Sequence, residues 1–99
     1  MNVSIQTVRF DADSKLIEQI QKKIQKLSTF SDNIIDVNVF LKLDNLAHTI
    51  KDKVVEIRVH IPQYDFFVKT SSKSFDVSFG DAFDSLVNQI KRKKEKQQV

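Results

Sequence analysis

The side chains that could bind a ligand are mainly cations, and they gather at two places in the chain. Lys22, Lys23 and Lys26 lie within five consecutive residues. A second group near the end consists of Lys91, Arg92, Lys93, Lys94 and Lys96. Lysine and arginine at this density bind phosphate groups without reading base sequence, and they suit structured RNA better than a DNA sequence.

The excess positive charge of the chain is confined to its end. The net charge is +3, from 16 basic and 13 acidic side chains. Residues 1–90 hold 11 basic and 12 acidic side chains, and residues 91–99 hold 5 and 1, a net of +4. Cations within a Debye length of about 8 Å reinforce one another, which favours a polyanionic partner. Lysines also complement the dipole at a helix C-terminus, and the cluster alone leaves both interpretations open.

Groups for catalysis are few. His48 and His60 are 12 residues apart, so no local spacing makes them a metal site, and each is predicted to lie on the surface. The chain has no cysteine, and its single glycine, Gly80, excludes a glycine-rich phosphate loop. We therefore expect no enzymatic activity, no catalytic residue, no metal and no cofactor, and the function class that remains is binding.

Length and composition set the frame for these groups. With 99 residues, of which 40% are hydrophobic, the chain has room for one core and enough apolar side chains to form it. No stretch approaches the roughly 18 apolar residues of a membrane span, and the first residues do not resemble a secretory signal. These features predict a cytoplasmic protein.

The apolar spacing predicts four strands and two helices. Residues 3–8, 34–43, 53–61 and 65–72 alternate as strands do, and residues 13–28 and 75–90 have helical spacing. Asp11 and Asp13 are candidate N-caps for the first helix. The residues predicted to face the core from the two middle strands are Ile35, Val37, Val39, Leu41, Leu43, Val55, Ile57, Val59 and Ile61.

The element order predicts an α+β domain over residues 1–90, with two helices packed on one face of a four-stranded sheet. Residues 91–99 are expected to form a basic extension of the last helix. Lys93 falls on the apolar side of that helix, so the last turns are expected to project from the body or fray. The outer sheet face would carry Asn38, Phe40, Lys42, Arg58, His60 and Lys69.

Three segments carry a family resemblance: KKIQKLSTFSDNI (22–34), VNVFLKLDNLAH (37–48) and LVNQIKRKKEK (86–96). With the element order, they resemble the short ribosome hibernation promoting factors, also called ribosome-associated inhibitor or sigma-54 modulation proteins. The resemblance covers nearly the whole chain. It implies a β-α-β-β-β-α fold similar to double-stranded-RNA-binding domains. The stretch FDVSFGDAF departs from the family, which usually has a tyrosine and an aspartate early in the last helix.

The resemblance also implies a function. Such proteins bind the small ribosomal subunit in the channel for messenger and transfer RNA, and they inhibit translation in stationary phase or stress. Because the resemblance is to short members, pairing of ribosomes would need a second hibernation factor. The positions matched to ribosomal RNA binding are Lys22, Lys23, Lys26, Lys42, His48, Lys91, Arg92, Lys93, Lys94 and Lys96.

Two alternatives stay open from the residues themselves. The domain could be a protein-interaction module that uses an edge strand or the sheet face with Phe40, the basic tail serving only solubility. It could also bind another structured RNA, since the electrostatic requirements are the same.

Overall fold

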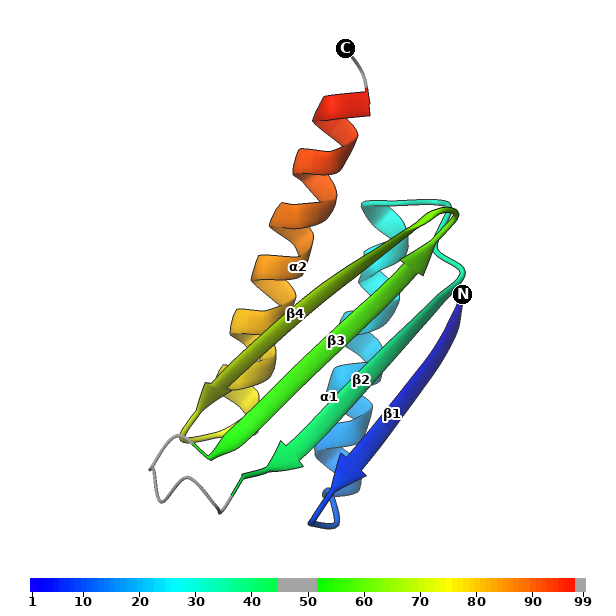
Figure 1. Ribbon diagram of the computed structural model, residues 1–99. Helices are drawn as coiled ribbons and strands as arrows, with labels where there is room; N and C mark the ends of the chain where they lie inside the picture. Colours follow the sequence, from blue (N-terminus) through cyan, green and yellow to red (C-terminus); the bar gives the residue numbers. More distant parts are fainter. Residues whose placement is uncertain (45–51, 98–99) are drawn as a thin grey trace.

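The chain forms a four-stranded sheet with both helices behind one face (Figure 1). The computed structural model describes residues 1–44 and 52–97. The predicted α+β fold and its β-α-β-β-β-α order are confirmed. The elements are β1 (Asn2–Val8), α1 (Ser14–Gln25), a 3₁₀ helix η1 (Lys26–Thr29), β2 (Asp36–Leu43), β3 (Lys53–Ile61), β4 (Tyr64–Ser72) and α2 (Phe75–Gln97).

The sheet is mixed, with the strands in chain order. β1 pairs parallel with β2, and the pairs β2–β3 and β3–β4 are antiparallel. A parallel pair needs a long crossover, and α1 provides it. The β3–β4 connection is a tight turn with Pro62 and Gln63 at its two central positions. Pro62 has the fixed φ that suits the first central position of a type II turn. Gln63 has a φ of 66°, and the second central position of that turn requires a positive φ.

The core lies between the sheet and the helices. The inner side chains of β2 and β3 alternate as predicted, and Val39 and Ile57 are cross-strand neighbours with no exposed surface. Ile24 of α1 and Leu86 of α2 are equally buried. The members of the core on β2, β3 and β4 are Val37, Val39, Leu41, Val55, Ile57, Val59, Ile61, Phe66 and Val68.

One predicted core position is wrong. Ile35 is 45% exposed, whereas Ile34 packs against the core. Both residues precede the first residue of β2, Asp36. Period-two alternation holds only within a strand, so extending it backwards into the preceding loop assigned the inward position to the wrong isoleucine.

The helix starts are capped by side chains. Asp13 accepts a hydrogen bond from the backbone N–H of Lys15 at 3.0 Å, which confirms one of the two predicted N-caps. Ser74 does the same for α2, where its Oγ accepts from the N–H of Val77 at 3.2 Å. These bonds satisfy amides that a helix start would otherwise leave without partners.

A buried serine joins the start of α2 to the sheet. Ser78 has no exposed surface. Its hydroxyl donates to the carbonyl of Lys53 at 2.6 Å and contacts the hydroxyl of Ser72 at 2.7 Å. Thr70 of β4 donates in turn to the Ser78 carbonyl at 2.5 Å. This network ties α2 to β3 and β4 near the helix start, so the direction of the whole helix is set there.

Both helices run the same way along the sheet, and their C-termini reach the same end of the molecule (Figure 1). The buried residues of α2 end at Ile90. At 1.5 Å per residue, the seven helical residues that follow extend the axis by about 10 Å. In Figure 1 this last part, drawn in red, rises past the end of the sheet.

Candidate nucleic-acid interface

The fold brings the two basic groups of the sequence to one end of the molecule. We call this region the basic end and define it as residues 22–33 and 91–97, which hold eight basic side chains and the two acidic residues Asp32 and Glu95. The structure therefore unites most of the predicted RNA-binding residues. They are Lys22, Lys23, Lys26, Lys91, Arg92, Lys93, Lys94 and Lys96.

Each helix contributes a lysine whose ammonium group lies over an aromatic ring from the other helix or from the loop that follows it. The Nζ of Lys23 on α1 lies 5.3 Å from the centroid of the Phe83 ring on α2. In the opposite direction, the Nζ of Lys91 on α2 lies 5.4 Å from the ring centroid of Phe30, which directly follows η1. Ring faces attract cations. The two contacts therefore place cations of both helices over the boundary between them.

The last turns of α2 project past the sheet, as expected, but Lys93 still contacts the body of the protein (Figure 1). Helix α2 is continuous to Gln97. The Lys93 side chain is half-buried, and its Nζ lies 4.0 Å from the ring centroid of Tyr64, at the start of β4. The long apolar stem of lysine can cover apolar surface while its charged end stays in water. A lysine on the apolar side of the helix is therefore compatible with packing.

The other cations of the basic end are exposed. Lys22, Lys26, Arg92, Lys94 and Lys96 all present their side chains to solvent. Within residues 1–44 and 52–97, the ion pairs join Lys42 to Glu56, Lys53 to Asp52 and His60 to Asp65. None of these involves a cation of the basic end, so its charges are available to an anionic ligand.

Among the described residues, one predicted site residue, Lys42, is not brought to this end. Lys42 lies on the outer sheet face, where its Nζ forms an ion pair with Glu56 at 2.7 Å and sits 5.9 Å from the Phe40 ring centroid. Helices α1 and α2 lie on the other side of the sheet (Figure 1). His48 falls outside the described residues. Contacts of Lys42 and His48 with RNA stay predictions.

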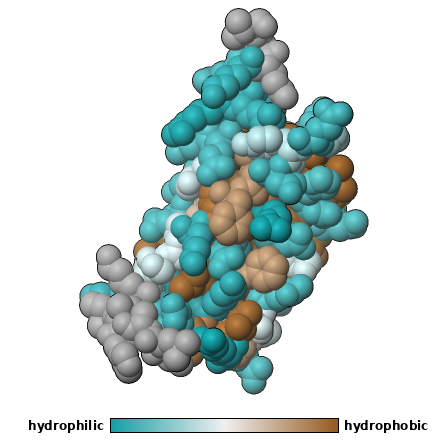
Figure 2. All heavy atoms as spheres, viewed as in Figure 1, coloured by the Kyte–Doolittle hydropathy of each residue, from teal (hydrophilic) through white to brown (hydrophobic). Residues whose placement is uncertain are grey.

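The outer sheet face is mixed in character. Figure 2 shows a mainly hydrophilic surface over the strands, with a few hydrophobic side chains between polar ones. Phe67 is 44% exposed, and the Arg58 guanidinium lies 5.5 Å from its ring centroid. His60 Nδ1 contacts the Asp65 carboxylate at 2.5 Å. Acidic and basic groups alternate here, so this face offers no concentration of one charge.

At the end opposite the basic end, cations and carboxylates are balanced. A hydrogen bond from Lys53 at 2.6 Å and the charge of that lysine hold the pKa of Asp52 below its usual value. Within residues 1–44 and 52–97, the other charged residues next to the helix starts and the ends of β2 and β3 here are Arg9, Asp11, Asp13, Lys15, Asp44, Lys73 and Asp76. The electrostatic asymmetry of the domain therefore arises at the basic end.

Across residues 1–44 and 52–97, no set of three or more histidine, aspartate or glutamate side chains is grouped to hold a metal ion. No helix in the same residues is long and apolar enough to cross a membrane.

Comparison with known families supplies an identity. The family model described as sigma 54 modulation protein / S30EA ribosomal protein matches residues 3–98. The chain belongs to this family. Among curated protein sequences, no relative matches it.

Solved structures share the fold of this S30EA family chain. The N-terminal domain of Protein Y from Thermus thermophilus superposes with a TM-score of 0.78 at 22% identity, covering 93% of this chain and 98% of that one. A ribosomal subunit interface protein from Coxiella burnetii superposes with a TM-score of 0.84 at 18% identity, covering 96% and 99%. At these identities the likeness establishes the fold.

In this S30EA family member, aromatic residues that no motif in the sequence singles out position the cations of the basic end. Phe30, Phe83 and Tyr64 each support a lysine of the basic end. Phe83 lies in the segment 75–90, whose helical spacing of apolar residues predicts only a buried face. Tyr64 directly follows the tight turn between β3 and β4. This position next to a turn indicates an aromatic ring at the end of the sheet, and it is the feature of the sequence from which the role of Tyr64 could have been predicted.

Proposed function

We propose that the protein is a ribosome hibernation factor that binds the small ribosomal subunit with its basic end. On this proposal it occupies the channel for messenger and transfer RNA and inhibits translation in stationary phase or stress. It acts in the cytoplasm, where ribosomes are, and any pairing of ribosomes uses a second factor. Membership of the S30EA ribosomal protein family supports this assignment.

The observation that carries the proposal is the union of two distant basic segments on one surface. Lys22, Lys23 and Lys26 are separated by more than 60 residues from the cluster at 91–96, yet the cation–ring contacts join them. Eight cations with two carboxylates make a focal positive field. Folded RNA presents closely spaced phosphates, and such a surface matches them through charge and shape.

The mechanism requires no reaction. The Lys and Arg side chains neutralise phosphates of ribosomal RNA, and each neutralised phosphate releases condensed counterions. The body of the domain then fills space that messenger and transfer RNA need. Binding is therefore competitive with those ligands and is weakened by salt.

The first test is sedimentation of a stationary-phase lysate through sucrose gradients at low and high salt, with the tagged protein followed by immunoblot. We expect co-migration with the small subunit or whole ribosomes at low salt and release at high salt. Protein that remains at the top of both gradients would contradict ribosome binding. Co-migration with another protein that survives high salt would favour the protein-interaction alternative, because apolar contacts are not screened.

A competition experiment tests the site. Purified small subunits are loaded with the protein, and messenger RNA with initiator transfer RNA is added. We expect the two RNAs to displace the protein, and the fraction of protein released to rise with the fraction of subunits whose channel holds RNA. Simultaneous binding of protein and both RNAs at full occupancy would show that the protein docks elsewhere on the subunit.

A further inference from the structure

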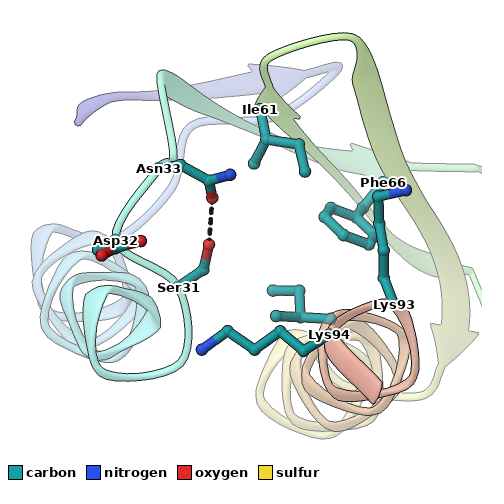
Figure 3. A pocket seen from close by; sticks show the side chains of 8 residues that line it. Ser31, Asp32, Asn33, Ile61, Phe66, Lys93 and Lys94 are labelled. Carbon is teal, nitrogen blue, oxygen red and sulfur yellow. Dashed lines mark hydrogen bonds between the residues drawn. The ribbon is translucent and has the colours of Figure 1, made fainter. Parts of the chain in front are cut away.

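A small cavity opens within the basic end, between the loop after η1, the β3–β4 hairpin and the last turns of α2. Figure 3 shows the side chains that surround it. Its apolar side consists of Ile61, Phe66 and Ile90, all nearly buried. The loop contributes Ser31 and Asn33 on the opposite side. The cavity thus combines an apolar wall, which includes an aromatic ring, with a polar wall.

The size of the cavity limits what can enter it. Its volume is about 120 Å³. An apolar protein cavity of about 150 Å³ holds one benzene molecule. At about 120 Å³ the cavity is close to this size, so it matches a single six-membered ring better than the two fused rings of a purine.

The polar wall presents a hydrogen-bond donor to this space. The Ser31 hydroxyl, which is 8% exposed as a residue, donates to Asn33 Oδ1 at 2.5 Å. This bond fixes the amide so that Nδ2 points into the cavity (Figure 3). The hydrogen bonds within residues 1–44 and 52–97 do not use that Nδ2. Its N–H groups can therefore donate to a ligand.

Cations flank the opening. Lys94 extends across the cavity toward Ser31, and the stem of Lys93 passes beside Phe66 (Figure 3). The Lys93 ammonium is then held over Tyr64. An anionic group just outside the cavity would meet the Lys94 ammonium, while a neutral ring inside would meet Asn33 and the apolar wall.

We propose that this cavity binds one unpaired pyrimidine nucleotide of RNA. The pyrimidine ring enters the cavity, a carbonyl oxygen of the base accepts from Asn33 Nδ2, and the phosphate lies at Lys94. Unpaired bases of structured RNA are commonly read by aromatic contact and by hydrogen bonds to their edges. This inference rests on the proposed function, to which it adds a preference for one class of base at one position.

Nuclear magnetic resonance titration of the isotope-labelled full chain tests the preference. The probes are uridine, cytidine and adenosine 5′-monophosphates and ribose 5-phosphate. We expect the pyrimidine nucleotides to bind about five- to tenfold more tightly than the other two probes. This ratio of affinities corresponds to the net free energy of about one hydrogen bond. Their shifts should include the Asn33 side-chain amide and the backbone of residues 31–33 and 90–94.

An isosteric variant tests the donor. Asn33→Asp keeps an acceptor for Ser31 and replaces the amide donor by a carboxylate oxygen. We expect it to reduce the pyrimidine preference to within about twofold of adenosine monophosphate. The matched control, Asn88→Asp, adds the same charge at an exposed position of α2 outside the cavity, and it should retain the preference.

The outcomes separate this inference from the proposed function. Equal binding of all four probes by the wild-type protein would indicate phosphate contacts alone and overturn the pyrimidine site, as would a complete absence of shifts. The same wild-type preparation is also sedimented with ribosomes. Ribosome binding without a pyrimidine preference refutes only the cavity inference, whereas failure to co-sediment refutes the proposed function itself.

Discussion

Single lysines differ in their surroundings, and this difference predicts their contributions to binding. Lys91 is exposed and held near Phe30 at the basic end. Lys15 is equally exposed but lies in the first turn of α1, at the other end of that helix. If the protein binds ribosomes as proposed, we expect Lys91 to contact phosphate and Lys15 not to.

We expect Lys91→Ala to weaken ribosome binding several-fold and to reduce the slope of log affinity against log salt by about 1, because one phosphate contact is lost. Affinities at four or more salt concentrations provide the slope. Lys15→Ala, the control, should leave both quantities unchanged. Equal losses in the two variants would mean that net charge alone matters.

The contact between Lys93 and Tyr64 leads to a prediction about stability. Tyr64→Leu removes the ring beneath the ammonium and the edge contact with Phe66 at 4.9 Å. An exposed cation–ring contact contributes about 0.5–1 kcal/mol, and an aromatic pair about 0.5–1.5 kcal/mol. We expect urea unfolding to show a loss of about 1–2 kcal/mol for Tyr64→Leu and little change for Tyr64→Phe, which keeps the ring. A similar loss in both variants would instead implicate the Tyr64 hydroxyl.

At the scale of elements, the attachment of α2 decides whether the basic end exists. The helix is tied to the sheet near its start through Ser78 and by apolar contacts up to Ile90. Its last turns depend on that attachment for their direction. Stability near the helix start and binding at the helix end are thus linked through one rigid element.

We expect Ser78→Ala to destabilise the fold by about 1–3 kcal/mol, because the Lys53 carbonyl loses its buried hydroxyl donor and the Ser72 hydroxyl loses a partner. Ser85→Ala, on the exposed face of the same helix, serves as the control and should change stability by less than about 0.5 kcal/mol. Chemical denaturation of both variants measures the difference. An unchanged midpoint for Ser78→Ala would show that water replaces the hydroxyl without cost.

At the scale of the whole molecule, the placement of charge matters more than its sum. The domain is almost neutral apart from the last residues of the chain, yet folding sets Lys22, Lys23 and Lys26 beside them. Fields of neighbouring cations add, whereas the same cations dispersed over the surface are screened separately.

Two quadruple variants with the same change in net charge test this. Replacement of Lys91, Arg92, Lys93 and Lys94 by Ala should retain the fold, since alanine favours helix, and should nearly abolish ribosome binding. Replacement of Lys15, Arg58, Lys69 and Lys73 by Ala removes three lysines and one arginine elsewhere. The second variant should bind nearly as well as wild type in co-sedimentation, with circular dichroism confirming the fold of both. Equal weakening would contradict a focal site.

Most of the fold follows from the spacing of apolar residues along the chain. Period-two and helical spacing of apolar residues specify which side of each strand and helix is buried, because a side chain's direction follows from local backbone geometry. The strands, the helices and the inward positions of Val39 and Ile57 were predicted for this reason. The exception, Ile35, precedes its strand, where no such periodicity applies.

Which functional residues lie together depends on how the elements pack in three dimensions. Lys42 and Lys22 carry the same charge and lie 20 residues apart, but the direction of each element places Lys42 beside Glu56 on the outer face and Lys22 at the basic end. The cavity beside Asn33 likewise combines residues from a loop, a hairpin and a helix. Such contacts depend on chain direction and sheet order, which arise from packing of the whole core and are not encoded in any local spacing.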